Sequence, residues 1–132
     1  MTQDDRGDHR RPSLTIELLS ALVRCGLTHD DRRHLRFFFE ASSLRVAVEL
    51  AGELRERSPA AVYVRPVPLR RLARRRWTVT LTTPPAPLSL GAIHLWEQEM
   101  REVARRRPAS RLVSWKLMLT PEDFERIGVR SP

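Results

Sequence analysis

The sequence predicts one α+β domain, in which a four-stranded antiparallel sheet carries two helices on one face. Three observations lead to this fold class. After residue 34, the hydrophobic periodicity follows the order strand, helix, strand, strand, helix, strand. The second of these strands contains prolines, which place it at a sheet edge because proline cannot donate to a central ladder. With 132 residues, 41% of them hydrophobic, the chain is long enough for one domain with a modest core.

The region before the sheet is expected to hold a tail and a helix. Residues 1–12 are polar and charged and show no periodicity, which predicts a disordered tail. Ser13 stands at a helix N-cap position, Gly26 stands at a stop position, and apolar residues between them recur at helical spacing. We therefore expect an amphipathic helix over 13–25.

The first strand and helix follow directly. Residues 35–41 alternate with a period of two, and Phe38 falls on the mixed face of this strand. Ser42 or Ser43 is expected to cap a helix that ends before Pro59. The apolar stripe expected for this helix consists of Leu44, Ala47, Val48, Ala51 and Leu54.

The next two strands are expected to form a hairpin. Residues 61–67 read as a strand at the sheet edge, because they run into Pro66 and Pro68. The Arg-rich stretch 69–76 then connects this edge strand to 77–82, whose apolar residues alternate regularly with threonines. We place the second of these strands inside the sheet.

The last elements are a second helix, a fourth strand and a short terminal helix. Ser89 is expected to cap the helix that Pro108 closes, after a stiff link that contains Pro84, Pro85 and Pro87. Residues 111–119 form the predicted fourth strand, with one face made of Val113, Trp115, Leu117 and Leu119. The remaining residues, 121–132, are expected to form a short helix to Ile127 and a tail.

With right-handed crossovers, this βαββαβ order gives a ferredoxin-like plait over residues 13–120, with its strands in the spatial order 4-1-3-2. Trp77, Trp96 and Trp115 all fall on the expected core faces.

Four short motifs stand out along the chain: Arg36-Phe37-Phe38-Phe39-Glu40, Glu53-Leu54-Arg55, Trp77-Thr78-Val79 before a Pro-rich link, and Val113-Ser114-Trp115. In these motifs the chain resembles the regulator of ribonuclease activity B family, the small ferredoxin-like inhibitors of ribonuclease E. The resemblance implies a regulatory protein that acts by binding another protein.

The charge of the chain raises a second hypothesis. The net charge is +8, and every basic residue except Lys116 is an arginine. This excess has two explanations, the codon bias of a GC-rich genome and a surface for acidic partners. Two clusters could contact a partner or a phosphate: Arg70, Arg71, Arg74, Arg75 and Arg76 in the hairpin connection, and Arg105, Arg106 and Arg107 at a helix end. The alternative is a solvated loop together with cations that complement a helix C-terminus.

The uncovered side of the sheet is the other candidate surface. RNA-recognition motifs stack bases on aromatic residues of such a face, yet here threonines occupy the outward positions of strand 77–82. Phe38 is the one ring expected on this face. We therefore expect Arg36, Phe38 and Lys116 to serve a partner or dimer contact.

Enzyme, metal and cofactor chemistry have little support in the sequence. The spacing of Cys25, His29, Asp30 and His34 fits no standard zinc pattern, and no catalytic residue or cofactor is assigned. We expect a non-enzymatic regulatory or adaptor domain in the cytoplasm, with a protein partner, no membrane association and a homodimer left open. The alternatives are a nucleic-acid-binding protein that uses the Arg clusters, and a small dimeric ferredoxin-like enzyme with a base such as His34.

Overall fold

The computed structural model describes residues 17, 19–24, 26–28, 30–57, 62–67 and 76–127. Its elements are β1 (Arg32–Arg33), β2 (Leu35–Ala41), α2 (Leu44–Arg57), β3 (Val62–Pro66), β4 (Trp77–Thr82), β5 (Ala86–Pro87), α3 (Leu90–Arg105), β6 (Ser110–Leu117) and α4 (Pro121–Ile127). Of the helix expected over 13–25, residues 17 and 19–24 are described and are helical. The tail 1–12 lies outside the described residues.

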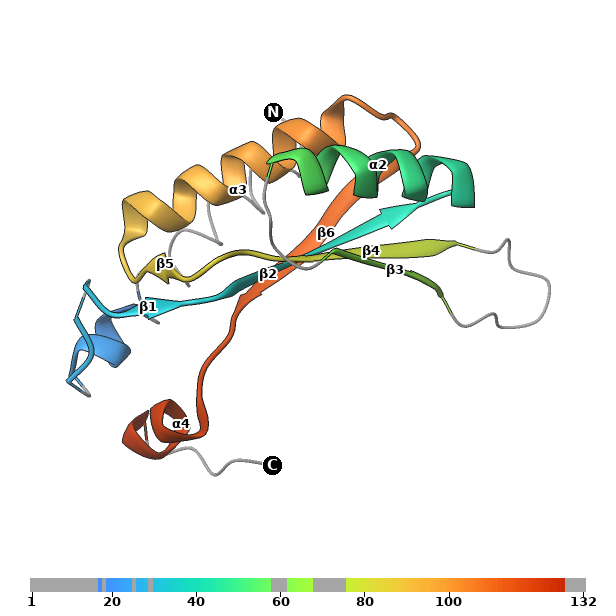
Figure 1. Ribbon diagram of the computed structural model, residues 1–132. Coiled ribbons are helices and arrows are strands. Elements are labelled where there is room, and N and C mark those ends of the chain that lie inside the picture. The colour runs from blue at the N-terminus through green and yellow to red at the C-terminus, as the bar shows by residue number, and fades with distance from the viewer. Residues whose placement is uncertain are drawn as a thin grey trace.

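The main sheet has four strands in the order β3-β4-β2-β6, and every neighbouring pair is antiparallel. This is the strand order expected from the sequence, and the proline-bearing β3 lies at the edge as predicted. The helices α2 and α3 lie side by side on one face of this sheet (Figure 1). The fold is therefore a mixed α+β arrangement in which α2 and α3 cover one sheet face and leave the other without a covering helix among the described residues.

A second, two-stranded sheet was not expected. Strand β1 pairs antiparallel with β5, so that Arg32 lies opposite Pro87 and Arg33 opposite Ala86. The sequence predicts a stiff link that contains Pro84, Pro85 and Pro87 in this region, not a strand. A strand of two residues is too short to show an alternating pattern, so periodicity could not reveal this pair.

Serine side chains begin both long helices, as the sequence predicts. The Ser43 hydroxyl accepts a hydrogen bond from the Val46 backbone N–H at 3.2 Å. The Ser89 hydroxyl accepts one from Ala92 N–H, also at 3.2 Å. Each cap satisfies a donor that the first helical turn leaves without an intrahelical partner.

The buried face of α2 is rotated relative to the expected stripe. Leu44 and Val48 are exposed, although both were expected to face the core. The buried residues of this helix are Ala47, Leu50, Ala51 and Leu54. These positions follow the i, i+3, i+4, i+7 spacing, and Leu44 and Val48 flank one side of that face.

The core lies between the covered face of the sheet and the two long helices. Phe37 and Phe39 of β2 are fully buried, and the ring centroid of Phe37 lies 6.2 Å from that of Trp115. Trp77, Trp96 and Trp115 are partly buried and pack against this core, as expected. Other buried members include Leu50 and Leu54 from α2, Val79 and Leu81 from β4, and Ile93, Met100 and Val103 from α3.

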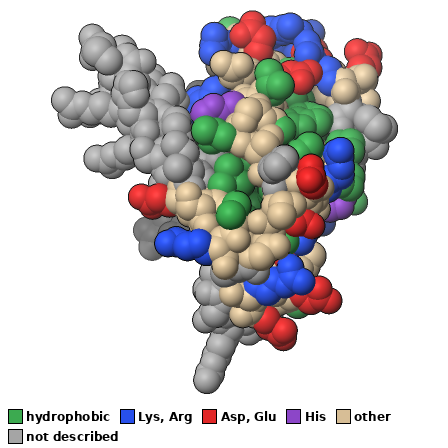
Figure 2. Space-filling model, turned by 90° about the vertical axis from the view of Figure 1, so that its left-hand side faces the viewer, with side chains coloured by type: hydrophobic (Ala, Val, Ile, Leu, Met, Phe, Trp, Pro, Cys, Tyr) green, Lys and Arg blue, Asp and Glu red, His purple; other side chains and the backbone are tan. Residues whose placement is uncertain are grey.

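A smaller cluster lies at the end of the molecule that carries β1 and β5. Leu22, Leu27 and Leu88 are buried together, with Leu117 and Leu119 packed against them. Figure 2 views the molecule from this end and shows apolar side chains among scattered charges of both signs. This cluster packs the described helical residues 19–24 against the rest of the fold.

Candidate functional site

The candidate site is the sheet face that α2 and α3 leave uncovered, which we call the open face. Cross-strand partners project from the same side of a sheet, so the register identifies its members. Arg36, Phe38 and Glu40 of β2 alternate with buried neighbours and therefore point to this side. Through the strand pairings, the open face consists of Arg36, Phe38, Glu40, Tyr63, Arg65, Thr78, Thr80, Thr82, Arg111, Ser114 and Lys116.

A β-bulge in β6 determines which of its side chains reach the open face. Phe38 pairs with Ser114 and Phe39 with Leu112, so Val113 is an extra residue in this strand. Arg111 and Lys116 are five positions apart, so in a regular strand their side chains would point to opposite faces. The extra residue of the bulge lets both project from the same face. The prediction that Val113 lies on the core face is wrong: its side chain is 40% exposed.

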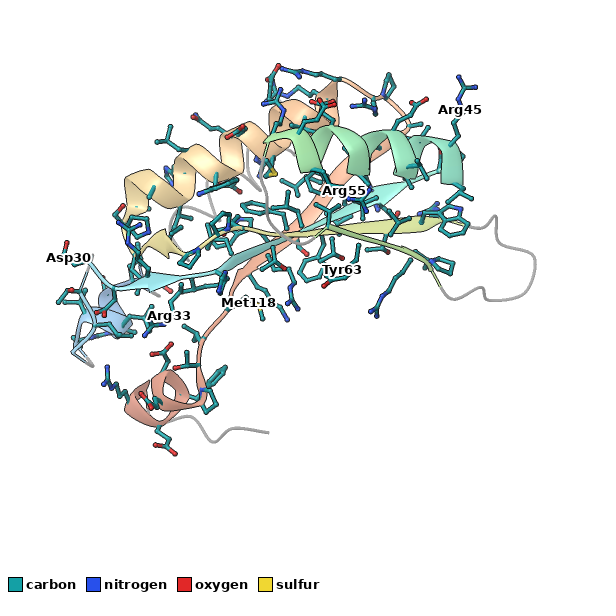
Figure 3. All side chains as sticks on the ribbon, viewed as in Figure 1. Asp30, Arg33, Arg45, Arg55, Tyr63 and Met118 are labelled. Carbon is teal, nitrogen blue, oxygen red and sulfur yellow. The ribbon has the colours of Figure 1, made fainter. Side chains whose placement is uncertain are left out.

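Two aromatic rings lie on the open face. Phe38 was expected there, and the Lys116 ammonium lies 5.8 Å from its ring centroid, which is cation–π distance. Tyr63 was not expected. It pairs with Thr80, which pairs in turn with Phe38, so the three residues form one row across three strands. Figure 3 shows Tyr63 projecting away from α2, and its side chain is 54% exposed.

The open face is positively charged. Its described residues include four cations, Arg36, Arg65, Arg111 and Lys116, and one carboxylate, Glu40. The Arg36 guanidinium is held in place by Thr82, whose hydroxyl accepts from Nε at 3.1 Å. The predicted contact residues Arg36, Phe38 and Lys116 therefore lie together on one surface, with Arg36 and Lys116 directly opposite each other.

One end of the open face is hollowed. A cleft of about 420 Å³, which we call the Glu40 cleft, is lined by Glu40, Ala41, Ser42, Arg76, Pro108, Ala109, Ser110 and Arg111. Within it, Glu40 Oε1 accepts from Arg76 Nη1 at 3.0 Å and from Arg111 Nη2 at 3.3 Å. Arg76 is the member of the predicted hairpin cluster that the structure describes; Arg70, Arg71, Arg74 and Arg75 lie outside the described residues.

The second predicted Arg cluster is engaged with acids of the same chain. Arg106 contacts Glu53 at 2.9 Å, Arg107 also contacts Glu53, and Arg105 lies 3.6 Å from Glu102. Burial alone would raise the pKa of Glu53, but the hydrogen bond and charge of Arg107, with help from neighbouring arginines, lower it below its ordinary value. Much of the charge of Arg106 and Arg107 therefore stabilises the contact between the ends of α2 and α3.

Asp30 and His34 are the described members of the set considered for metal or acid–base chemistry. His34 is exposed, and its Nδ1 lies 2.8 Å from the Thr83 carbonyl oxygen. Cys25 and His29 lie outside the described residues. In the described parts of the chain, no group of three or more His, Cys, Asp or Glu side chains could hold a metal ion. The enzyme alternative stays a hypothesis.

Among the helices that the structure describes, none has the length and apolar character needed to cross a membrane. No protein-family model matches the chain, and no curated protein sequence matches it.

Proposed function

We propose that this chain is a non-enzymatic regulatory or adaptor domain, a ferredoxin-like plait whose open face binds an acidic segment of a protein partner. The observation that supports this proposal most strongly is the composition of the open face. Tyr63 and Phe38 lie in one row, with Arg36, Arg65 and Lys116 around them. Tyrosine and arginine are enriched among the few residues that contribute most of the binding energy at protein interfaces, and the excess of cations favours an acidic partner.

The resemblance to the ribonuclease regulators supports the same kind of activity, because those proteins act by binding another protein. It also suggests a role in the regulation of RNA metabolism, which we propose takes place in the cytoplasm. The intramolecular ion pairs of Arg106 and Arg107 make the open face a better candidate surface than the Arg cluster at the end of α3.

Single-stranded nucleic acid is the second candidate ligand of the open face. The observation that favours it is that Tyr63 is exposed on a basic sheet face. Successive bases stack on aromatic platforms in such proteins. Here the Lys116 ammonium lies over the ring of Phe38, where a base would have to stack. Thr80 also separates Phe38 from Tyr63. Two strand spacings amount to about 10 Å, which is far for two consecutive stacked bases. These features favour a protein partner.

A pull-down from nuclease-treated host lysate tests the proposal. The tagged chain should retain a protein partner at physiological salt. The double variant Tyr63→Ala, Lys116→Glu should lose that partner. A matched control on the helix face is Leu95→Ala, Arg105→Glu, which removes another exposed apolar side chain and reverses another exposed cation. Equal retention by both variants, or no partner for the unaltered chain, would contradict the proposal.

Capture that disappears after nuclease treatment would instead favour the nucleic-acid candidate. In that case, binding to mixed RNA should fall steeply between about 50 and 200 mM salt. Charge reversal at Arg70, Arg71 and Arg74 should abolish it, as the sequence hypothesis requires.

A further inference from the structure

The Glu40 cleft contains two guanidinium groups that share one carboxylate oxygen. Arg76 and Arg111 each make a single contact, and both contacts fall on Glu40 Oε1. The side chains of Arg76 and Arg111 are 60% and 67% exposed, whereas that of Glu40 is 24% exposed. Both arginines therefore offer further donors to a molecule that enters from solvent.

We propose that the Glu40 cleft is a carboxylate-binding site, in which an Asp or Glu side chain of the partner replaces Glu40 as the ligand of Arg76 and Arg111. This inference rests on the proposed function and names the group that the open face recognises. In the structure, the Glu40 carboxylate occupies this site, which shows that the two guanidinium groups together bind a carboxylate. A free carboxylate can form the forked, two-bond contact with arginine that Glu40 forms with neither of them.

The charges around the cleft favour this exchange. Two cations face one internal anion, so one positive charge is left over even while Glu40 is engaged. Arg65 lies in the same row of the open face, because Arg65 pairs with Thr78 and Thr78 pairs with Glu40. An incoming carboxylate therefore meets an uncompensated positive potential at this end of the open face.

Strand β2 holds Glu40 beside Arg76 and Arg111. Its carboxylate therefore competes with an external carboxylate for the two guanidinium groups at a fixed effective concentration. Glu40 lies in the central strand β2 and is paired on both sides, with Thr78 and with Arg111. Only molecules in which Glu40 has left the two arginines can bind an external carboxylate there, so the apparent affinity is scaled down by the fraction of such molecules. Removal of the Glu40 charge should therefore strengthen binding, although most charge changes at an interface weaken it.

The experiment measures the fluorescence anisotropy of a labelled hexa-aspartate peptide with the full chain at low salt. Glu40→Gln should bind the peptide about five- to tenfold more tightly than the unaltered chain, as expected when a competing ion pair is removed. Arg76→Glu and Arg111→Glu should each bind at least about tenfold more weakly. Glu102→Gln is the matched control, because it makes the same change in net charge at an exposed ion pair of α3. It should change the affinity less than about twofold.

Equal affinities for Glu40→Gln and Glu102→Gln would overturn the proposal, as would a lack of peptide binding by both the unaltered chain and Glu40→Gln. A dT oligonucleotide serves as a second probe, and a larger gain from Glu40→Gln for this probe than for the peptide would overturn the assignment to a carboxylate. The pull-down separates the two proposals. If Tyr63→Ala, Lys116→Glu loses the partner while Arg76→Glu and Arg111→Glu both keep it, the open face remains the binding surface and the Glu40 cleft does not take part.

Discussion

Arg33 and Asp123 form a forked ion pair that joins strand β1 to the terminal helix α4. Arg33 Nε lies 2.7 Å from Asp123 Oδ2, and Nη2 lies 2.8 Å from Oδ1. The same carboxylate accepts from the Thr120 backbone N–H at 2.9 Å, and Thr120 Oγ1 accepts from Asp123 N–H at 3.1 Å. One buried side chain thus caps α4 and ties it to β1, so that α4 lies beyond one end of the sheet, on the side away from α2 and α3 (Figure 1).

Asp123→Asn should lower the free energy of unfolding by about 2–3 kcal/mol, because it leaves Arg33 without its charged partner in a largely buried place. Urea unfolding at pH 7 measures this loss. The control is Glu122→Gln, which removes an exposed acid from the same helical turn and should cost less than about 0.5 kcal/mol. Equal losses for the two variants would show that helix charge, and not the ion pair, stabilises α4.

The stabilisation by Asp123 should depend on pH in a defined direction. The hydrogen bonds from Arg33 hold the pKa of Asp123 well below its ordinary value of 3.8, against the opposing effect of burial. A depressed folded-state pKa means that the contribution is complete above the pKa of the unfolded chain and is lost as the pH falls toward the folded value. The stability difference between the unaltered chain and Asp123→Asn should therefore stay constant from pH 7 to about pH 5 and shrink below about pH 4. A difference that grows on acidification would contradict this account.

Glu53 should contribute to stability through the contact between α2 and the turn after α3. It accepts from Arg57 within its own helix and from Arg106 and Arg107 across that contact. Glu53→Gln should reduce the free energy of unfolding by about 1–2 kcal/mol, since its side chain is mostly buried and bonded to three cations. Glu56→Gln, an exposed position one turn later, should change it by less than about 0.5 kcal/mol. If Glu53→Gln and Glu56→Gln unfold at the same urea concentration, Glu53 does not have the stabilising role assigned to it.

The alternation of β2 predicts opposite outcomes at adjacent phenylalanines. Phe39→Ala should destabilise the fold by about 3–5 kcal/mol, because it removes a fully buried ring from the core. Phe38→Ala removes a partly exposed ring from the open face and should cost about 1 kcal/mol or less. Thermal unfolding of the two variants compares them directly, and a larger loss at Phe38 would mean that the two faces of the sheet have been assigned the wrong way round.

The sequence predicted the sheet because its strongest signals are local. The alternation of residues 35–41 and 77–82, the helix-capping serines Ser43 and Ser89, and the edge position of the proline-bearing β3 are all confirmed. Each depends on the physical preferences of a few neighbouring residues, which a single sequence displays.

Features that arise from pairing were not predictable in the same way. The bulge at Val113 shifts the face of β6 without a glycine or proline to mark it, and the pair β1–β5 is too short to show a period. Tyr63 had a usable signal, because it stands between Val62 and Val64, which pack on the opposite side of the strand. The Glu40 cleft brings together Arg76, which directly precedes β4, and Arg111 of β6, and this depends on how β4 and β6 pair with β2.

The most direct test of the open face as the binding surface is site-specific photocrosslinking at two exposed positions. The photoreactive amino acid p-benzoylphenylalanine replaces Tyr63 on the open face in one variant and Leu95 on the helix face in another; these side chains are 54% and 67% exposed. After irradiation in nuclease-treated lysate, the variant at position 63 should form a crosslink to a partner protein, and the variant at position 95 should form none. A crosslink at position 95 with none at position 63 would contradict the central claim.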